Sequence, residues 1–177
     1  MTDDVVVRAL GAVEANDRGA ELADILIDCV EGGASVGFVA PLPRGMAQAF
    51  WRGVADGVAA GERMLLVAED TRSARLIGTV QVIAAQPENQ PHRADIAKML
   101  VHRAARRRGI GGLLMQAAED AARAAGKTLL VLDTATGSDA DRLYQRLGWM
   151  RVGVVPDYAL WPDGGPCATT YYYKALR

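Results

Sequence analysis

Seven consecutive residues have the types and spacing that point most directly to chemistry: Arg106, Arg107, Arg108, Gly109, Ile110, Gly111 and Gly112. They lie where an apolar, strand-like segment (96–101) gives way to a helix-like segment (110–125). Glycine lets a backbone turn tightly at such a junction, and the first N–H groups of the helix that follows are unpaired and partly positive. Together with the arginines, these groups predict a cradle for an anion such as a phosphate.

Two nucleotide-binding motifs do not fit this junction. A Walker P-loop needs Lys-Ser or Lys-Thr directly after its glycines, whereas Lys127-Thr128 lies beyond the helix. The dinucleotide fingerprint G-x-G-x-x-G needs a glycine where this chain has Leu114. A solvated basic surface or a non-specific nucleic-acid patch stays open as an alternative for the arginine run alone.

Length and composition indicate one globular domain. The 177 residues suffice for a sizeable core, half of them are hydrophobic, and the formal net charge of −1 does not favour nucleic acid as a partner. Cys29 and Cys167 are far apart and form neither a disulfide framework nor a metal-binding pattern. Since the sequence shows no signal peptide and no membrane span, we expect a cytoplasmic protein that needs no metal and contacts no membrane.

Hydrophobic periodicity predicts a mixed α/β domain with helices packed on a central sheet, in the order βααβββαβαββ. The continuous apolar run 128–132 is typical of a buried central strand. Exposed sheet edges leave monomer and homodimer as alternatives. The strands are predicted at 5–10, 64–69, 76–83, 95–101, 128–132, 149–154 and 169–174, and the helices at 20–30, 45–60, 110–125 and 139–147.

Two motifs resemble the GCN5-related N-acetyltransferase (GNAT) superfamily. Arg106, Gly109 and Gly111 occupy the defined positions of its acyl-CoA-binding signature, and residues 140–149 read A-D-R-L-Y-Q-R-L-G-W, which resembles its A-x-x-L-Y-x-x-x-G-aromatic motif. The order of predicted elements also matches the superfamily. The resemblance implies one α/β domain over 1–177 with the GNAT fold, a mixed central sheet with splayed parallel strands and flanking helices, and acetyl-CoA as cosubstrate.

Further segments resemble the tabtoxin-resistance acetyltransferases, which acetylate a small amine-bearing toxin. They are residues 32–38, 94–101, 132–138 and 162–174. This resemblance implies an acetyl-CoA-dependent N-acetyltransferase that acts on a small-molecule amine. A protein or peptide N-acetyltransferase, and a catalytically inactive acyl-CoA sensor, remain the alternatives.

Acyl transfer from a thioester to an amine needs a group that takes up the ammonium proton. Asp95, at the start of one predicted strand, and Asp133, at the end of its neighbour, are the candidates, and they could flank one amine. Each could instead be a turn, capping or solvated edge residue. The resemblance assigns Tyr144 as the acid that assists the leaving thiolate, with core packing as the other possible role.

The resemblance also assigns binding roles along the chain. Backbone groups of Met99, Leu100 and Val101 would bind the pantetheine arm and the developing oxyanion, and residues 106–112 would hold the pyrophosphate. Many members carry Asn where this chain has Gly137, which puts one amide contact in doubt. Three residues of the loop 32–38 are expected to line the acceptor pocket, unless the loop is a plain connection: Gly33, Ser35 and Phe38.

Overall fold

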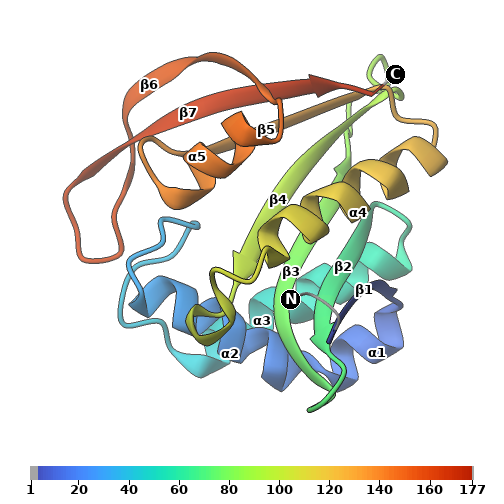
Figure 1. Ribbon diagram of the computed structural model, residues 1–177, viewed down its shortest axis with the longest axis vertical. Helices are drawn as coiled ribbons and strands as arrows, with labels where there is room; N and C mark the ends of the chain where they lie inside the picture. The colour runs from blue at the N-terminus through green and yellow to red at the C-terminus, as the bar shows by residue number, and fades with distance from the viewer. Residues whose placement is uncertain (1–3, 177) are drawn as a thin grey trace.

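The computed structural model describes residues 4–176, in which a seven-stranded mixed sheet carries helices on both faces (Figure 1). The strand order is β1-β2-β3-β4-β5-β7-β6, so β1 and β6 form the two edges. The strands are β1 (Val5–Leu10), β2 (Arg63–Asp70), β3 (Arg75–Ala84), β4 (Arg93–Val101), β5 (Leu129–Ala135), β6 (Met150–Leu160) and β7 (Pro166–Ala175).

The predicted helices all form, with ends that differ by a residue or so, and one helix was not predicted. The unpredicted helix is α1, whose six residues are too few to show a period. The helical segments are α1 (Ala12–Asp17), α2 (Gly19–Glu31), α3 (Arg44–Ala59), the short 3₁₀ turn η1 (Arg103–Ala105), α4 (Ile110–Ala124) and α5 (Asp139–Arg146).

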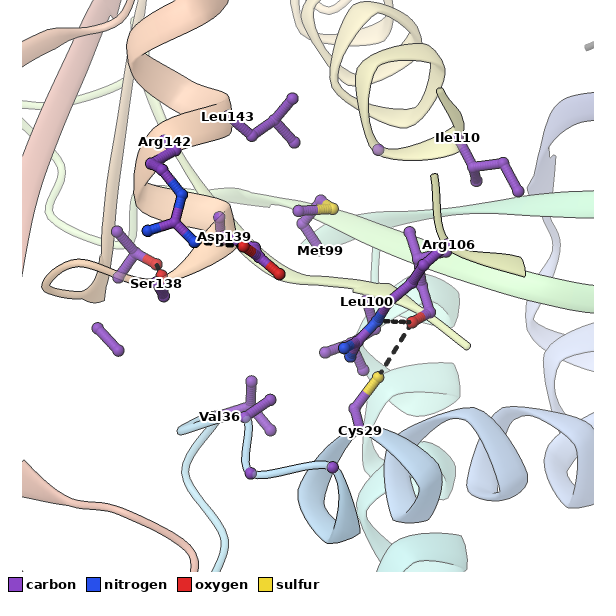
Figure 2. A pocket seen from close by; sticks show the side chains of 18 of the residues that line it. Cys29, Val36, Met99, Leu100, Arg106, Ile110, Ser138, Asp139, Arg142 and Leu143 are labelled. Atoms are coloured by element: carbon purple, nitrogen blue, oxygen red, sulfur yellow. Dashed lines mark hydrogen bonds and ion pairs between the residues drawn. The ribbon is translucent and has the colours of Figure 1, made fainter. Parts of the chain in front are cut away.

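The central feature of the sheet is the divergence of β4 and β5. Of the strand neighbours in the described chain, these two alone are parallel, and they pair only from Arg93–Leu129 to Asp95–Val131. Beyond Asp95 the strands separate, whereas β5 pairs with β7 along its whole length. The space between the separating ends is a cleft, into which Met99 of β4 and Leu143 of α5 project (Figure 2).

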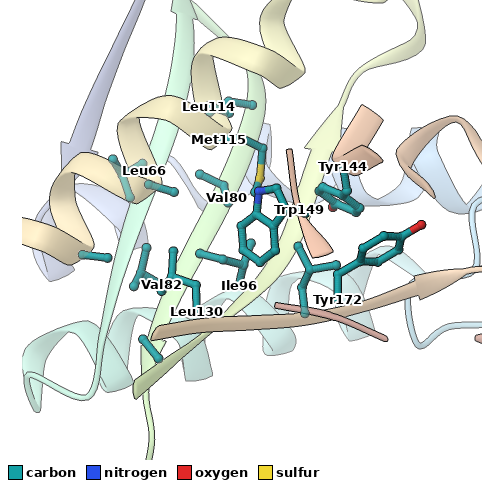
Figure 3. Close-up of a cluster of buried hydrophobic side chains, with 14 of the residues drawn as sticks. Leu66, Val80, Val82, Ile96, Leu114, Met115, Leu130, Tyr144, Trp149 and Tyr172 are labelled. Carbon is teal, nitrogen blue, oxygen red and sulfur yellow. The ribbon is translucent and has the colours of Figure 1, made fainter. Parts of the chain in front are cut away.

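Because successive side chains of a strand point to opposite faces of the sheet, the core is divided into two clusters. On one face of the sheet, α4 and α5 cover buried side chains that include Leu66, Ile96 and Leu130 (Figure 3). On the other face, α2 and α3 cover a second cluster that includes Leu65 and Leu100. The sheet is therefore covered on both faces near β4, the strand that borders the cleft.

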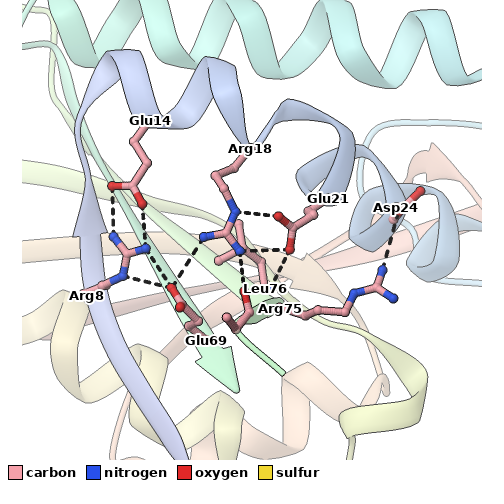
Figure 4. A network of polar contacts seen from close by, with 9 residues as sticks. Arg8, Glu14, Arg18, Glu21, Asp24, Glu69, Arg75 and Leu76 are labelled. Carbon is pink, nitrogen blue, oxygen red and sulfur yellow. Dashed lines mark hydrogen bonds and ion pairs between the residues drawn. The ribbon is translucent and has the colours of Figure 1, made fainter. Parts of the chain in front are cut away.

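A network of ionic contacts fixes α1 and α2 to the edge of the sheet (Figure 4). Arg8 of β1 lies 2.6 Å from Glu14 of α1 and 2.7 Å from Glu69 of β2. Arg18 lies 2.5 Å from Glu21, which also accepts the Leu76 N–H at 3.0 Å. These contacts explain how so short a helix as α1 is held in place, and they lie apart from the residues that line the cleft.

Candidate active site

The cleft has a volume of about 760 Å³ and is lined by five separate parts of the chain. They are the end of α2 with the loop after it, the end of β4 with the turn into α4, the end of β5, α5 with its N-cap, and the β6–β7 turn at Trp161. Because β4 and β5 diverge, their C-terminal ends leave room between the two halves of the sheet. Sites of this kind at the carboxyl ends of parallel strands are common in α/β proteins.

The turn into α4 has the backbone geometry of an anion cradle. Arg107 (φ 63°) and Gly109 (φ 75°) both adopt left-handed conformations, and Gly109 is the N-cap of α4. The N–H groups of 107–111 have no hydrogen-bond partner in the described part of the chain. Unpaired amides at a left-handed turn and a helix N-terminus together bind anions, and the predicted residues thus form a structure suited to a pyrophosphate.

The three predicted arginines separate into two groups. Arg106 and Arg107 line the cleft, and Arg106 donates from Nε to the Val101 carbonyl at 3.3 Å. Arg108 does not line it, because its guanidinium reaches Asp70 of β2 at 3.4 Å. Nearby, Arg103 pairs with Asp28 at 2.9 Å. The basic run is therefore partly neutralised within the protein, which disfavours the alternative of a free nucleic-acid patch.

Two arginines that sequence reasoning missed stand on the opposite wall. Arg142 and Arg146 of α5 line the cleft, with Asp139 as the acidic residue beside Arg142 (Figure 2). Their four-residue spacing puts both on one helix face, which is the signal that could have found them. The cleft thus presents arginines on both sides, a suitable surround for a ligand with several phosphates.

A β-bulge directs the end of β4 into the cleft. The register with β3 shifts between Thr79 and Gln81, and Lys98 has a φ of 48°. After the bulge, Met99 and Val101 pack on the α4 side of the sheet, whereas Leu100 belongs to the cluster under α2 and α3. All three of these residues line the cleft, and their edge of the strand has no β5 neighbour. That edge is available to hydrogen-bond with an amide-bearing ligand.

The two predicted carboxylates share a face of the sheet. Ala94 and Leu130 lie in the cluster under α4 and α5, so Asp95 and Asp133 project from the opposite face. Neither lines the cleft itself. Asp95 forms an ion pair with Arg93 at 2.5 Å.

Asp133 has a different environment from Asp95. Its carboxylate accepts a hydrogen bond from the Thr169 hydroxyl at 3.1 Å and has no ion pair within the described residues. Burial raises the pKa of Tyr144, and a hydrogen bond with Tyr158 raises that of Tyr171; the negative charge of Asp133 adds to both shifts. The same charge opposes the fall in the pKa of Lys98 that burial causes. Of the two carboxylates on this face, Asp133 is therefore the one whose negative charge has no cationic partner among the described residues.

Tyr144 is buried rather than exposed to the cleft. It is 5% exposed and packs against Trp149 and Tyr172, with ring centroids 6.1 Å away in both cases. Burial raises the pKa of its hydroxyl, and the charge of Asp133 adds to the effect. The hydroxyl consequently stays protonated at neutral pH, and it makes no hydrogen bond with any residue that the structure describes.

The loop after α2 is fixed to the turn between β6 and β7. The Ser35 hydroxyl donates to the Leu160 carbonyl at 3.1 Å, and the Ala40 N–H donates to the Pro162 carbonyl at 2.8 Å. Gly33 and Ser35 line the cleft, together with Trp161 of the β6–β7 turn. The loop therefore spans the two halves of the sheet at one end of the cleft.

The third predicted loop residue is placed differently. Phe38 does not line the cleft, and it packs edge-on against Phe50 of α3 with ring centroids 5.4 Å apart. Its packing role is set by an aromatic partner on α3, which the local loop sequence does not reveal. Of the three predicted loop residues, Gly33 and Ser35 are therefore the two that an acceptor in the cleft could contact.

The unusual glycine before α5 has a conformational reason. Gly137 has a φ of 76°, a left-handed value that disfavours a side chain at this position. Its N–H donates to Asp141 at 2.7 Å, and the Asp141 N–H donates to the N-cap Ser138 at 3.1 Å. Asp141 and Ser138 thus fix the start of α5 without an asparagine amide.

The class of protein follows from three features taken together, and it is an acyl-CoA-dependent transferase. These features are the diverging parallel strands, the anion cradle at a helix start and the long basic cleft. Residues 38–149 match the model of the Acetyltransferase (GNAT) family. A protein of Azospirillum brasilense, described as an uncharacterized N-acetyltransferase in the hisH–hisA intergenic region, is 32% identical over 132 residues, which cover 73% of this chain and 75% of that protein. The chain belongs to the GNAT acetyltransferase family.

Solved structures share the fold over almost the whole chain. The yncA protein of Salmonella typhimurium, determined with its cofactor acetyl-CoA, has a TM-score of 0.78 and 18% identity, covering 99% of this chain and 95% of that one. Ribosomal-protein-alanine N-acetyltransferase from Brucella melitensis has a TM-score of 0.76 and 19% identity, covering 97% and 99%. The predicted GNAT fold is confirmed, and the protein is an acetyl-CoA-dependent N-acetyltransferase. In the part of the chain that the structure describes, no helix is long and apolar enough to cross a bilayer.

Proposed function

We propose that this N-acetyltransferase acetylates the amine of a small molecule, by direct attack of the amine on the thioester. The observation that carries the proposal is the bridge between the loop after α2 and the β6–β7 turn, formed by Ser35 with Leu160 and by Ala40 with Pro162. The bridge joins the loop to the turn beside the part of the cleft that Gly33, Ser35 and Trp161 line, which we assign to the acceptor. A small acceptor can enter there, whereas a folded protein substrate needs an open groove.

Acetyl-CoA supplies the activated acetyl group, and the cleft has residues suited to hold it. The unpaired N–H groups of 107–111 face the ligand's charge as an anion cradle, and Arg106 and Arg107 add attraction. The bulged edge of β4 at Met99, Leu100 and Val101 offers backbone partners for the pantetheine amides. The same edge supplies an N–H donor for the carbonyl oxygen as it gains charge.

Of the two candidate carboxylates, Asp133 is the one whose charge is not compensated by a cationic side chain among the described residues, so we assign it the acceptor amine. An alkylammonium has a pKa near 10.4 and must lose its proton before it attacks. Asp133 binds the ammonium and takes the proton, directly or through water. Asp95 shares the same face but is already paired with Arg93, so its charge is compensated.

Tyr144 completes the proton balance of the transfer. The amine nitrogen forms a bond to the carbonyl carbon and gives up its second proton to water, and the carbon–sulfur bond breaks. The thiolate takes a proton from the tyrosine hydroxyl, directly or through water, while Asp133 returns its proton to solvent. The raised pKa of Tyr144 supports this role, because it keeps the hydroxyl in its donor form. The tyrosine then regains its proton from solvent.

A thiol-release assay with acetyl-CoA tests the proposal. Amine-bearing toxins are the first acceptors to try, since the sequence resembles the tabtoxin-resistance acetyltransferases, followed by antibiotics, polyamines and peptides. We expect thiol release with small amines and not with peptides. Release with peptides alone would identify a peptide acetyltransferase instead, and binding of acetyl-CoA without release for any amine would indicate a sensor.

A further inference from the structure

Exposed hydrophobic side chains gather on β6, the edge strand that follows α5. Of the twelve large hydrophobic residues that the described part of the chain exposes, seven belong to β6 or to its neighbour β7. They are Met150, Val152, Val154, Val155, Tyr158, Leu160 and Tyr173. Single exposed hydrophobic residues are ordinary on a protein surface, whereas a cluster of them marks an interaction site.

The helices α2 and α3 do not extend to this part of the sheet (Figure 1). No described residue of β5, β6 or β7 belongs to the core cluster that these two helices cover. Met150 pairs with Tyr173, which follows the buried Tyr172, so Met150 and Tyr173 project from the face opposite α5. The ring of Tyr158 packs edge-on against Tyr171 on the same face, with centroids 5.9 Å apart. This half of the face is therefore open to a partner.

The free edge of β6 does not offer a regular ladder of backbone hydrogen bonds. The register with β7 shifts between Arg151 and Gly153. It shifts again between Val155 and Ala159, where Pro156 has no N–H to donate. Bulges and proline prevent the open-ended pairing of edge strands. A partner on β6 is therefore held mainly by side chains, which suits a closed dimer rather than a growing sheet.

The charges of β6 are complementary to those of a second copy of the same strand. Arg151 and Asp157 are the only charged residues of β6, and both are exposed. Neither forms an ion pair among the residues that the structure describes. They lie three positions to either side of Val154. Two copies of β6 that run antiparallel about a two-fold axis at Val154 therefore bring each Arg151 beside the partner's Asp157.

We propose that the protein forms a two-fold homodimer in which β6 of each copy packs antiparallel against β6 of the other. A two-fold interface needs a surface that is complementary to itself, and a strand with one cation, one anion and apolar residues between them meets this condition. The seven exposed side chains present roughly 600 Å², which approaches the about 800 Å² that each partner buries in a standard interface. Tyrosine and methionine, both present here, are enriched in such interfaces.

The proposed interface ends next to the cleft. Leu160, the last residue of β6, accepts the hydrogen bond from the Ser35 hydroxyl, and Trp161, which follows it, lines the cleft. The second copy would therefore contact the strand that leads into the β6–β7 turn, one of the five parts of the cleft wall. The inference does not depend on which amine the protein acetylates.

Sedimentation velocity over about 1 to about 100 μM protein tests the dimer. We expect a wild-type species of twice the chain mass of 18.8 kDa. Val154→Lys places two like charges at the two-fold axis and should raise the dimer Kd by at least about tenfold. Val6→Lys is the matched control, because Val6 lies on the other edge strand, β1, and is 42% exposed against 40% for Val154. This control should dimerise like the wild type.

An exchange of charges tests the antiparallel alignment itself. Arg151→Glu brings two acidic side chains together at each contact of its own dimer, and Asp157→Lys brings two basic ones together, so each variant alone should dimerise weakly. In the mixed dimer of the two variants, both contacts join opposite charges. Native mass spectrometry of an equimolar mixture should therefore show the mixed dimer in excess over either parent dimer.

Three results would overturn the inference. They are a wild-type monomer over the whole concentration range, a dimer that survives Val154→Lys, and a dimer lost in Val6→Lys, which would place the contact at β1 instead. A mixture of the charge variants with no excess of the mixed dimer would overturn the alignment about Val154. Acetyl-CoA affinity equal to that of the wild type, measured by calorimetry, confirms that each variant is folded.

Discussion

At the scale of single residues, the difference between Asp133 and Asp95 decides the chemistry. Both project from the same face of the sheet, yet Asp95 is paired with Arg93 at 2.5 Å and Asp133 accepts only the neutral Thr169 hydroxyl. A carboxylate whose charge is already compensated attracts an ammonium less strongly. The sequence placed both residues at strand ends and left them equal, because the neighbour of each becomes known only from the folded sheet.

Asp133→Asn tests this difference. The substitution keeps the shape of the side chain and removes the group that accepts the proton, so we expect kcat/KM to fall by about 10²- to 10⁴-fold. A pH–rate profile measures the effect, and the variant should recover rate at high pH as the amine loses its proton to solvent. Asp95→Asn is the matched control and should change the rate little. An unaltered rate in both variants would remove the proposed base.

Tyr144→Phe tests the second proton transfer. The variant removes the hydroxyl and retains the ring that packs against Trp149 and Tyr172. We expect kcat to fall while KM for acetyl-CoA changes little, because the hydroxyl acts on the leaving sulfur rather than on ground-state binding. Since the pKa of Tyr144 is raised, the wild type should show no loss of rate from this group up to pH 10. A variant with full kcat would leave Tyr144 with a packing role.

At the scale of elements, the turn into α4 and the start of α5 form two sides of the cleft. The turn into α4 uses left-handed conformations at Arg107 and Gly109, and Ser138, the N-cap of α5, follows a left-handed Gly137. Local spacing in the sequence revealed the first feature, since glycines mark such turns. It did not reveal that Arg108 would pair with Asp70, because that contact joins residues 38 positions apart.

Gly109→Ala tests the anion cradle. A side chain at a left-handed position costs about 1–2 kcal/mol, and the backbone can relieve it only by moving the unpaired amides. We expect the Kd for acetyl-CoA, measured by calorimetry, to rise about tenfold. Gly53→Ala in α3 is the matched control, because a Cβ there meets no atom within 4 Å and the affinity should not change. Equal affinity in both variants would contradict the role of the turn.

The pH dependence of stability tests the anchoring of α5. Burial by itself raises the pKa of Asp141, but hydrogen bonds from the Tyr172 hydroxyl and the Gly137 N–H hold it below its usual value. A lowered folded-state pKa gives stability that is present above the unfolded value of about 3.9 and lost as the pH falls below it.

Thermal denaturation of Asp141→Asn provides the measurement. The variant lacks the titrating group, so its Tm should be lower than that of the wild type at pH 7 and should fall less between pH 5 and pH 3. Asp139→Asn, on the exposed side of α5, should follow the wild-type curve. If Asp141→Asn and the wild type lose the same Tm over this range, the carboxylate does not anchor the helix.

At the scale of the whole molecule, sequence reasoning predicted the fold well and the acceptor side poorly. The order of strands along the chain and the long helix follow from local patterns and are confirmed, whereas the anion cradle at residues 106–112 stays a prediction. Three features required contacts between distant segments: α1, which Arg8 and Glu14 hold to the sheet, the β4 bulge beside Lys98, and the placement of Phe38 on Phe50. The exposed edge strand β6 leaves the choice between monomer and homodimer a prediction.

The central claim is that one acetyl group passes from acetyl-CoA to one small amine beside Asp133. The most direct measurement quantifies free thiol and N-acetylated amine in the same reaction, the thiol by colorimetry and the product by mass spectrometry. We predict equal amounts of the two from the wild type, and a parallel loss of both in Asp133→Asn. Thiol release without acetylated amine, or acetylation of peptides in place of every small amine, would contradict the account.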